Sequence, residues 1–267
     1  DIPVSKVSGV IMQNEISRIE TAKYRKSLLD TSLTFINVDD VHNGDDLPKA
    51  YKGEGVIVGV LDTGIDWEHP AFSGESGTRI QYLWDMSDDS NPPDEFDYGT
   101  EYTKEDIDAG NVNQKDNIGH GTHVASTSAG TAGADYNYTG VAPKSDIVFV
   151  KGFRENPYFA DNDIVNGCNY IFQKAEELNK PVVTNLSLGG LEGNTGYSLY
   201  EEALTELIEP GKLIAAAAGN EGSQNLHLKY TMNGSSVEEA GETYWYVTDE
   251  SNELTIITGY PKSDDFN

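Results

Sequence analysis

The sequence has little cysteine, little positive charge and no long apolar run. Cys168 is the only cysteine in 267 residues, so no intrachain disulfide can form and stability must come from packing or bound ions. Lysine and arginine total 18 against 45 acidic residues, giving a net charge of -27 that repels nucleic acid and anionic lipid. No segment approaches the roughly 20 apolar residues of a transmembrane helix, and the N-terminus shows no signal-peptide pattern. Nucleic-acid and membrane-surface roles are therefore not expected.

Apolar runs alternate with amphipathic stretches from residue 55 to about 220, which favours an α/β fold with a parallel sheet covered by helices on both faces. The runs are near-continuously apolar, as expected for strands buried on both faces, and lie at 56–61, 146–151, 182–188 and 212–218. A helix is expected from Ser198, where Glu201 completes a capping box, to the ProGly pair at 210–211. Cys168 lies in an apolar helical stripe, which favours a buried, unreactive thiol.

Two segments depart from this alternation. Residues 85–117 are acidic and contain proline, so we expect a surface excursion with solvated charges and a short helix capped by Thr103. After Asn220 the pattern changes to short apolar runs separated by polar turns, which predicts an antiparallel β insertion near the C-terminus.

Three motifs carry candidate chemistry. The first strand ends in AspThrGly, which places Asp62 at the carboxyl edge of the sheet, where open α/β folds assemble their sites. Aspartic proteases and phosphotransferases also use an aspartate in such contexts, so this motif alone leaves those classes open. An aspartic protease would need a second AspThrGly triplet and an all-β pattern, and the sequence has neither.

The second motif is the GlyHisGlyThrHis run at 119–123, in which glycines flank His120 and permit close packing against another strand end. A core histidine is an alternative, as is a metal pair with His123, although no glutamate completes a zincin pattern. The third motif is AlaGlyAsn at 218–220, where a side-chain amide at a strand end can donate to an oxyanion. A simple turn asparagine is the alternative for Asn220.

In the order aspartate, histidine and amide-bearing AlaGlyAsn turn, these motifs resemble the subtilase family, supported by matching stretches at 69–72, 139–143 and 185–190. The resemblance implies that Asp62 orients the imidazole, that His120 acts as general base and acid, and that Asn220 stabilises the oxyanion. It also implies a protein or peptide substrate, added as a β-strand along Ser187, Leu188, Gly189 and Gly190, with Glu221 at the rim of the neighbouring side-chain pocket.

The chain departs from the family pattern at two points. No GlyThrSer motif for the nucleophile occurs in the 267 residues, so the resemblance implies a serine endopeptidase with its serine downstream, or a catalytically dead pseudoprotease that binds or regulates. No cofactor is required for the chemistry. A structural calcium is common in the family, but Ala71 stands where an aspartate ligand is usual, so we expect that site to be absent; acidic residues in 85–117 leave an ion elsewhere open.

The resemblance also divides the chain and suggests where it works. Residues 1–25 are similar to the end of an N-terminal propeptide, 26–225 to an incomplete protease domain, and 226–267 to the start of a β-rich insertion found in larger bacterial members. Both ends look like cuts through a longer chain. An extracellular or cell-envelope location in a bacterium is expected.

Overall fold

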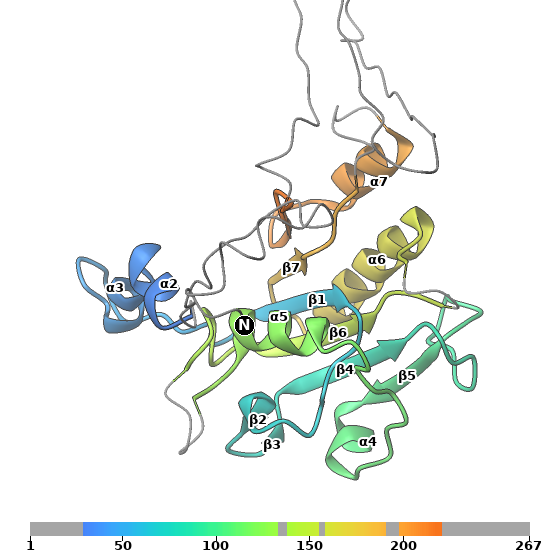
Figure 1. The fold of residues 1–267 in the computed structure, drawn as a ribbon, viewed down its shortest axis with the longest axis horizontal. Helices are drawn as coiled ribbons and strands as arrows, with labels where there is room; N and C mark the ends of the chain where they lie inside the picture. The colour runs from blue at the N-terminus through green and yellow to red at the C-terminus, as the bar shows by residue number, and fades with distance from the viewer. Residues whose placement is uncertain (1–28, 133–137, 155–157, 191–197, 221–267) are drawn as a thin grey trace, which may run out of the picture.

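The computed structural model describes residues 29–132, 138–154, 158–190 and 198–220, and shows one six-stranded sheet (Figure 1). The strand order is β5-β4-β6-β1-β7-β8. The strands are β1 (Ile57–Asp62), β4 (Ile80–Asp85), β5 (Thr100–Thr103), β6 (Asp146–Lys151), β7 (Val182–Leu186) and β8 (Lys212–Ala216). Neighbours pair in parallel, except that β5 runs antiparallel to β4 at the sheet edge. The α/β prediction is confirmed, with β4 and the antiparallel β5 added to the four predicted strands.

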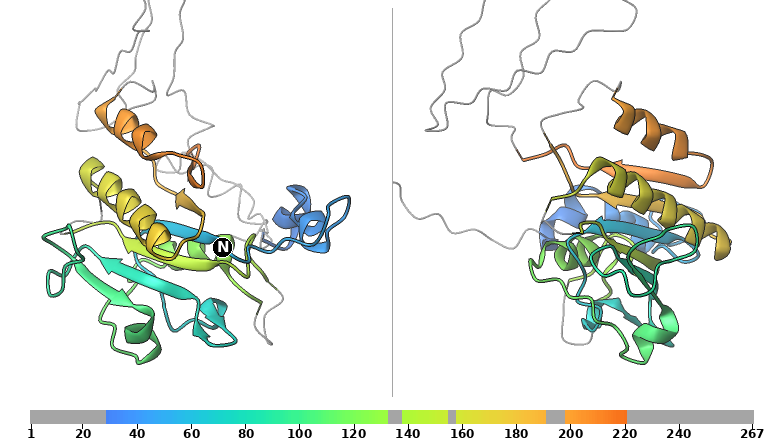
Figure 2. Two further views of the ribbon diagram at one scale, coloured as in Figure 1. Left: turned by 180° about the vertical axis from the view of Figure 1, so that it is seen from behind. Right: turned by 90° about the vertical axis from the view of Figure 1, so that its right-hand side faces the viewer.

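Helices cover both faces of the central strands (Figures 1 and 2). α5 (His120–Ala129) packs on one face, whereas α6 (Asp161–Glu177) and α7 (Leu199–Leu207) pack together on the other. Side chains of β1 alternate accordingly: Leu61 joins the cluster beneath α6, and Val60 joins the cluster beneath α5. Because Asp62 follows Leu61, the alternation directs its side chain toward the α5 face.

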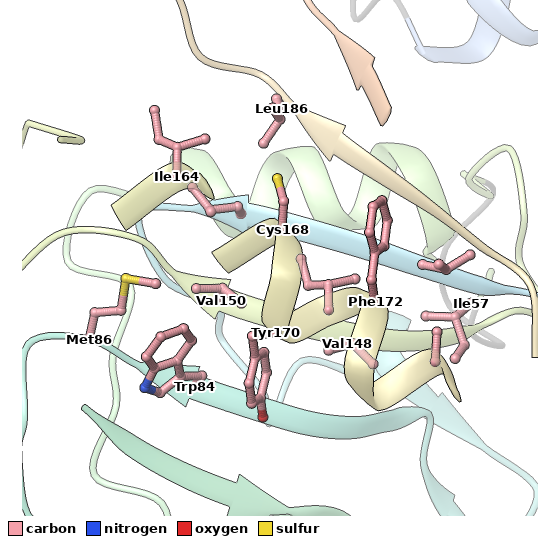
Figure 3. Close-up of a cluster of buried hydrophobic side chains, with 14 of the residues drawn as sticks. Ile57, Trp84, Met86, Val148, Val150, Ile164, Cys168, Tyr170, Phe172 and Leu186 are labelled. Atoms are coloured by element: carbon pink, nitrogen blue, oxygen red, sulfur yellow. The ribbon is translucent and has the colours of Figure 1, made fainter. Parts of the chain in front are cut away.

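Cys168 lies within the larger apolar cluster, between α6 and the sheet (Figure 3). Its side chain is 0% exposed, and burial raises the pKa of the thiol to about 12. Trp84 and Tyr170 belong to the same cluster, with ring centroids 4.9 Å apart. The predicted burial of the thiol is confirmed, and its lack of reactivity stays a prediction.

Smaller elements surround the sheet: α2 (Leu29–Phe35), α3 (Val38–Asn43), η2 (Pro70–Phe72), β2 (Ser73–Gly74), β3 (Gly77–Thr78) and α4 (Lys104–Asp108). α2 and α3 lie to one side of the sheet in Figure 1 and in the left view of Figure 2, and the His42 ring contacts the carbonyl of Val141 at 2.8 Å. Within the described ranges, no helix is long and apolar enough to cross a bilayer. Residues 1–25 and 226–267, the predicted propeptide end and β insertion, lie outside the described residues.

Both predicted helix starts are confirmed by their side-chain contacts. Ser198 and Glu201 form the capping box of α7, which ends at Leu207, just before Pro210 and Gly211. Thr103 caps α4 in the same way, with Asp106 as its reciprocal partner. In each case the capping side chains satisfy backbone N–H groups that the first helical turn leaves unpaired.

The prediction of a solvated acidic excursion at 85–117 is wrong in part. This segment contains β5 and buries Tyr98 and Ile107, and the buried Asp85 and partly buried Glu101 are each paired with a lysine rather than solvated. Asp85 lies 3.2 Å from the ammonium of Lys151, and Glu101 lies 3.0 Å from that of Lys174. The basic partners are more than 60 residues away in sequence, so only the folded sheet reveals them.

The expectation that every apolar run is buried on both faces is also wrong. Val183 on β7 and Leu213 on β8 are 38% and 52% exposed. They form a register pair on the face opposite α6, and no described helix lies over them. β1 and β6 are buried on both faces because α5 covers their second face.

Candidate active site

Asp62 ends β1 with its side chain wholly buried. Its Oδ1 atom accepts a hydrogen bond from the backbone N–H of Thr63 at 2.7 Å. Its Oδ2 atom is buried and has no hydrogen-bond partner among the described residues. The chain turns at once through Gly64, whose φ of 131° lies in the region that disfavours side chains. The carboxylate is thus held rigidly at the carboxyl edge of the sheet.

His120 is the first residue of α5 and contacts Asp62 directly. The Nδ1 atom of His120 lies 2.7 Å from Oδ1 of Asp62, and the imidazole remains 49% exposed. An ionised carboxylate can only accept, so Nδ1 donates and the lone pair is placed on Nε2. The imidazole therefore has one nitrogen anchored by a buried carboxylate and the other suited to accept a proton.

Close backbone packing makes this contact possible. Gly121 lies against the turn after β1, where an added β-carbon would stand 2.2 Å from the carbonyl oxygen of Gly64. A β-carbon on Gly64 would in turn meet the side chain of Gln114 at 2.6 Å. Gly64 and Gly121 are thus required by contact, as the sequence predicted for Gly121, whereas an added β-carbon on Gly119 would meet no atom within 4 Å.

Asn220 lies at the same carboxyl edge, four residues after β8, and is exposed within the described part of the chain. Ser187, Leu188, Gly189 and Gly190 directly follow β7, which is the strand between β1 and β8. They form no regular secondary structure; Leu188 packs partly on the core, and both glycines are exposed. Glu221 lies outside the described residues. The sheet therefore gathers every described candidate at one edge, while the roles given to Asn220 and to 187–190 stay predictions.

The other histidines are placed apart from this pair. His69 accepts a hydrogen bond from the backbone N–H of Ala71 at 3.2 Å through its Nδ1 atom and caps the short helix η2. The family resemblance also implies that His123 packs beneath the site, but this residue is exposed in the described structure, so that expectation is wrong. Across the described ranges, no three His, Cys, Asp or Glu side chains gather as metal ligands.

Sequence reasoning missed Asp116, which accepts hydrogen bonds from the first turn of α5 and from Thr63. Burial alone would raise the pKa of Asp116, but hydrogen bonds from Thr122, Gly119 and Thr63 outweigh burial and lower it. A short acidic side chain just before a helix start is a recognised capping signal, and it was available in the sequence. Gln114 was also missed; it is buried and contacts the backbone N–H of Ile65 at 3.4 Å.

Comparison with known proteins places the chain in a family. A model of the subtilase family, Peptidase_S8, matches residues 53–259. A subtilisin of Bacillus sp. (strain TA39) is 31% identical over 190 residues, which are 71% of this chain and 40% of that protein. Bacillopeptidase F of Bacillus subtilis (strain 168) is 32% identical over 181 residues, 64% of this chain and 12% of that protein.

Among solved structures, the CspB protease of Clostridium perfringens superposes with a TM-score of 0.60 at 34% identity, covering 69% of this chain and 39% of that one. The chain thus spans less than half the length of each relative named here. The family match includes the Asp62 strand, the His120 helix and the Asn220 turn. The chain belongs to the subtilase family of subtilisin-like peptidases.

Proposed function

We propose that this chain supplies the aspartate, histidine and oxyanion asparagine of a serine endopeptidase that hydrolyses peptide bonds through an acyl-enzyme. The observation that carries the proposal is the 2.7 Å contact between His120 Nδ1 and the buried Asp62 carboxylate. At a solvated carboxylate, water would compete with the imidazole N–H for the carboxylate oxygens. A buried carboxylate avoids this competition and holds the imidazole in a single orientation. Membership of the subtilase family supports the same reaction class.

In this proposal His120 Nε2 removes the proton from a serine hydroxyl as that oxygen attacks the substrate carbonyl. Asp62 stabilises the imidazolium that results and takes no proton itself. The imidazolium then gives its proton to the departing amine, and water repeats the sequence to release the acid. Asn220 donates its side-chain amide to the oxyanion in each tetrahedral intermediate.

The nucleophile is proposed to lie in sequence that follows residue 267, because the 267 residues contain no GlyThrSer motif. An extended segment of the protein substrate is proposed to pair with the backbone of 187–190, which continues from a sheet strand. Glu221 is proposed to favour a basic residue before the scissile bond through its charge, an effect that a wet rim keeps small. Residues 1–25 are proposed to be the end of a propeptide, and the location to be outside the cytoplasm, at the cell envelope or beyond.

A pseudoprotease that binds or regulates is the second candidate, and the missing serine motif is what favours it. A fluorophosphonate probe separates the two, because it reacts only with an activated serine. Residues 1–267 alone should remain unlabelled, and the full-length processed protein should be labelled at one downstream serine. His120→Ala should abolish that labelling, since the hydroxyl loses its base. Absence of labelling in the full-length protein would establish the pseudoprotease, and labelling within residues 1–267 would mean that the nucleophile lies in this chain.

A further inference from the structure

The carboxylate of Asp116 collects five hydrogen bonds at the junction between β1 and α5. Its Oδ1 atom accepts from the Thr63 hydroxyl at 2.9 Å and from the backbone N–H groups of Ile118 and Gly119 at 3.2 and 2.8 Å. Its Oδ2 atom accepts from the backbone N–H and the hydroxyl of Thr122, at 2.9 and 2.7 Å. All five partners are donors, so a group that only accepts, an ionised carboxylate, fits this position.

These bonds connect the two segments that hold the Asp62–His120 pair. Thr63 follows Asp62 directly and donates its backbone N–H to the Asp62 carboxylate, while its hydroxyl accepts from the backbone N–H of Gly121 at 2.9 Å. Gly121 follows His120 directly. The Thr63 hydroxyl oxygen therefore bonds both to Gly121, next to His120, and to Asp116. Thr63 itself is next to Asp62.

Helix capping alone does not account for this arrangement. The bonds from Gly119 and Thr122 satisfy the first turn of α5, as a cap would. The bond from Thr63 serves no helix end, since it reaches 53 residues back along the chain to the strand that carries Asp62. It fixes how far the start of α5 stands from the end of β1, and that separation sets the contact between the imidazole and the carboxylate.

We infer that Asp116 is a positioning residue for the Asp62–His120 pair, acting through Thr63 and the first turn of α5. The inference rests on the proposed peptidase function for its kinetic consequence. The hydrogen bonds of Asp116 go to Thr63 and to the residues at the start of α5, so it is placed to orient the imidazole without itself exchanging a proton. Its loss should therefore slow the chemical steps and leave substrate binding nearly unchanged.

The first test compares two aspartates that both accept from a helix start in the full-length protein. Asp116→Asn should lower kcat by roughly 10- to 100-fold, because small errors in the placement of catalytic groups are costly, with KM changed less than about twofold. Asp106→Asn removes the matching carboxylate from the capping box of α4, away from the pair, and should leave kcat unchanged. Equal kcat values for the two variants, with only melting temperatures lowered, would show that Asp116 is merely structural.

A second test removes the link without changing charge. Thr63→Val keeps the shape of the side chain but lacks the bridging hydroxyl, and should reproduce the kcat loss of Asp116→Asn. Thr63→Ser keeps the hydroxyl and should stay within about threefold of the parent. A valine variant as active as the serine variant would overturn the inference.

A third test of the positioning role uses NMR and needs no peptidase activity. Failure of this inference can therefore be distinguished from failure of the peptidase proposal. The proton on His120 Nδ1 gives a far-downfield NMR signal when it is held by a carboxylate. In the full-length protein that signal should shift or vanish in Asp116→Asn and Thr63→Val, and persist in Thr63→Ser and Asp106→Asn. The same signal in all four variants would refute the positioning role, whether or not the parent hydrolyses peptides.

Discussion

Gly121 on α5 touches the turn after β1 so closely that a β-carbon on it would lie 2.2 Å from the carbonyl oxygen of Gly64. Real β-carbons do not approach a backbone oxygen this closely, so a side chain here forces the helix and the turn apart. His120 precedes Gly121 and Asp62 lies two residues before Gly64, so separating the backbones also separates the imidazole from the carboxylate.

Gly121→Ala should therefore damage both stability and activity. Overpacking at this contact should cost about 1–3 kcal/mol in the free energy of unfolding, measured by urea denaturation. In the full-length protein kcat should fall about 100-fold, because the imidazole is displaced from the carboxylate. Ser126→Ala, on the same helix, adds no atom at the contact and serves as the control. A Gly121→Ala variant with parental kcat would show that the close approach is not needed.

The sequence was sufficient to predict the features that depend on local pattern. The strands β1, β6, β7 and β8, the helix starts at Thr103 and Ser198 and the burial of Cys168 all follow from periodicity or from local capping signals. Features set by distant partners were not predictable. β5 is only four residues long and is defined by its pairing with β4, and the interior position of Asp85 depends on Lys151.

In the candidate site too, residues within motifs were predictable from the sequence, and residues that depend on distant partners were not. The motifs singled out Asp62 and His120, which the fold brings within 2.7 Å. Asp116 was not predicted because its partner Thr63 follows β1, 53 residues earlier in the sequence. A single aspartate before a helix is also common on protein surfaces. Exposure of Leu213 could not be predicted either, because it depends on which helix covers that face of the sheet.

Asn220→Leu in the full-length protein should lower kcat by roughly 100- to 1,000-fold, the size of effect found when an oxyanion-hole donor is removed from subtilisin. The amide acts on charge that develops only after attack, so KM should change little. Steady-state kinetics on a peptide substrate measures both. Asn43→Leu, on α3 away from the sheet edge, is the control for a general effect of the substitution. A raised KM with unchanged kcat would contradict the oxyanion role.

Cys168 should resist alkylation as long as the protein is folded. Burial raises the pKa of its thiol to about 12, so almost no thiolate exists at pH 8, and the sulfur is also shielded from reagent. Mass spectrometry after incubation with iodoacetamide should show an unmodified chain, with complete modification once guanidinium chloride unfolds it. Rapid modification of the native protein at pH 8 would mean that the α6 face of the sheet opens readily.

Arg79 should stabilise the region around Ala71 in place of an ion. Its Nη1 atom donates to the carbonyl of Ser145 at 2.8 Å, and Nη2 donates to the carbonyls of Ala71 and Ala129 at 2.7 and 2.5 Å. A cationic side chain that already occupies these oxygens repels calcium, which supports the prediction that no calcium binds beside Ala71.

Arg79→Met keeps much of the length but leaves the three carbonyls without this donor. It should cost about 2–4 kcal/mol in the free energy of unfolding, since hydrogen bonds from charged donors are the stronger ones. Differential scanning calorimetry of the parent and the variant measures this loss of stability. A second scan of the parent with EDTA checks for calcium, and no calcium bound beside Ala71 should contribute to the parental melting temperature. Lys104→Met, which also removes a cation that donates to a backbone carbonyl, is a partly exposed control expected to cost less. Calcium density coordinated by the Ala71 carbonyl would contradict the prediction.

The stability that Asp116 contributes should depend on pH in a defined direction. Hydrogen bonds from Thr122, Gly119 and Thr63 overcome burial and hold the pKa of Asp116 below its ordinary value of 3.8. A carboxyl group with a lowered pKa in the folded state binds its proton more readily when unfolded. Its contribution is therefore complete above the unfolded pKa and is lost as the pH falls through the folded pKa.

Asp116→Asn replaces the carboxyl group by an amide that does not ionise, and keeps the shape of the side chain. The gap in unfolding free energy between the parent and this variant should be constant from about pH 7 to pH 5, and should narrow below about pH 4 as the parental carboxylate gains its proton. Urea midpoints at each pH measure the gap. Thr122→Val removes one of the donors that lower the folded pKa, so in that background the pH-dependent part of the gap should be smaller and should finish closing at a higher pH, while its onset, set by the unfolded pKa, stays the same. A gap that stayed constant to pH 2 in every background would mean that the Asp116 carboxylate is not stabilised by these donors, and that the bonds linking Thr63 to the start of α5 do not depend on its charge.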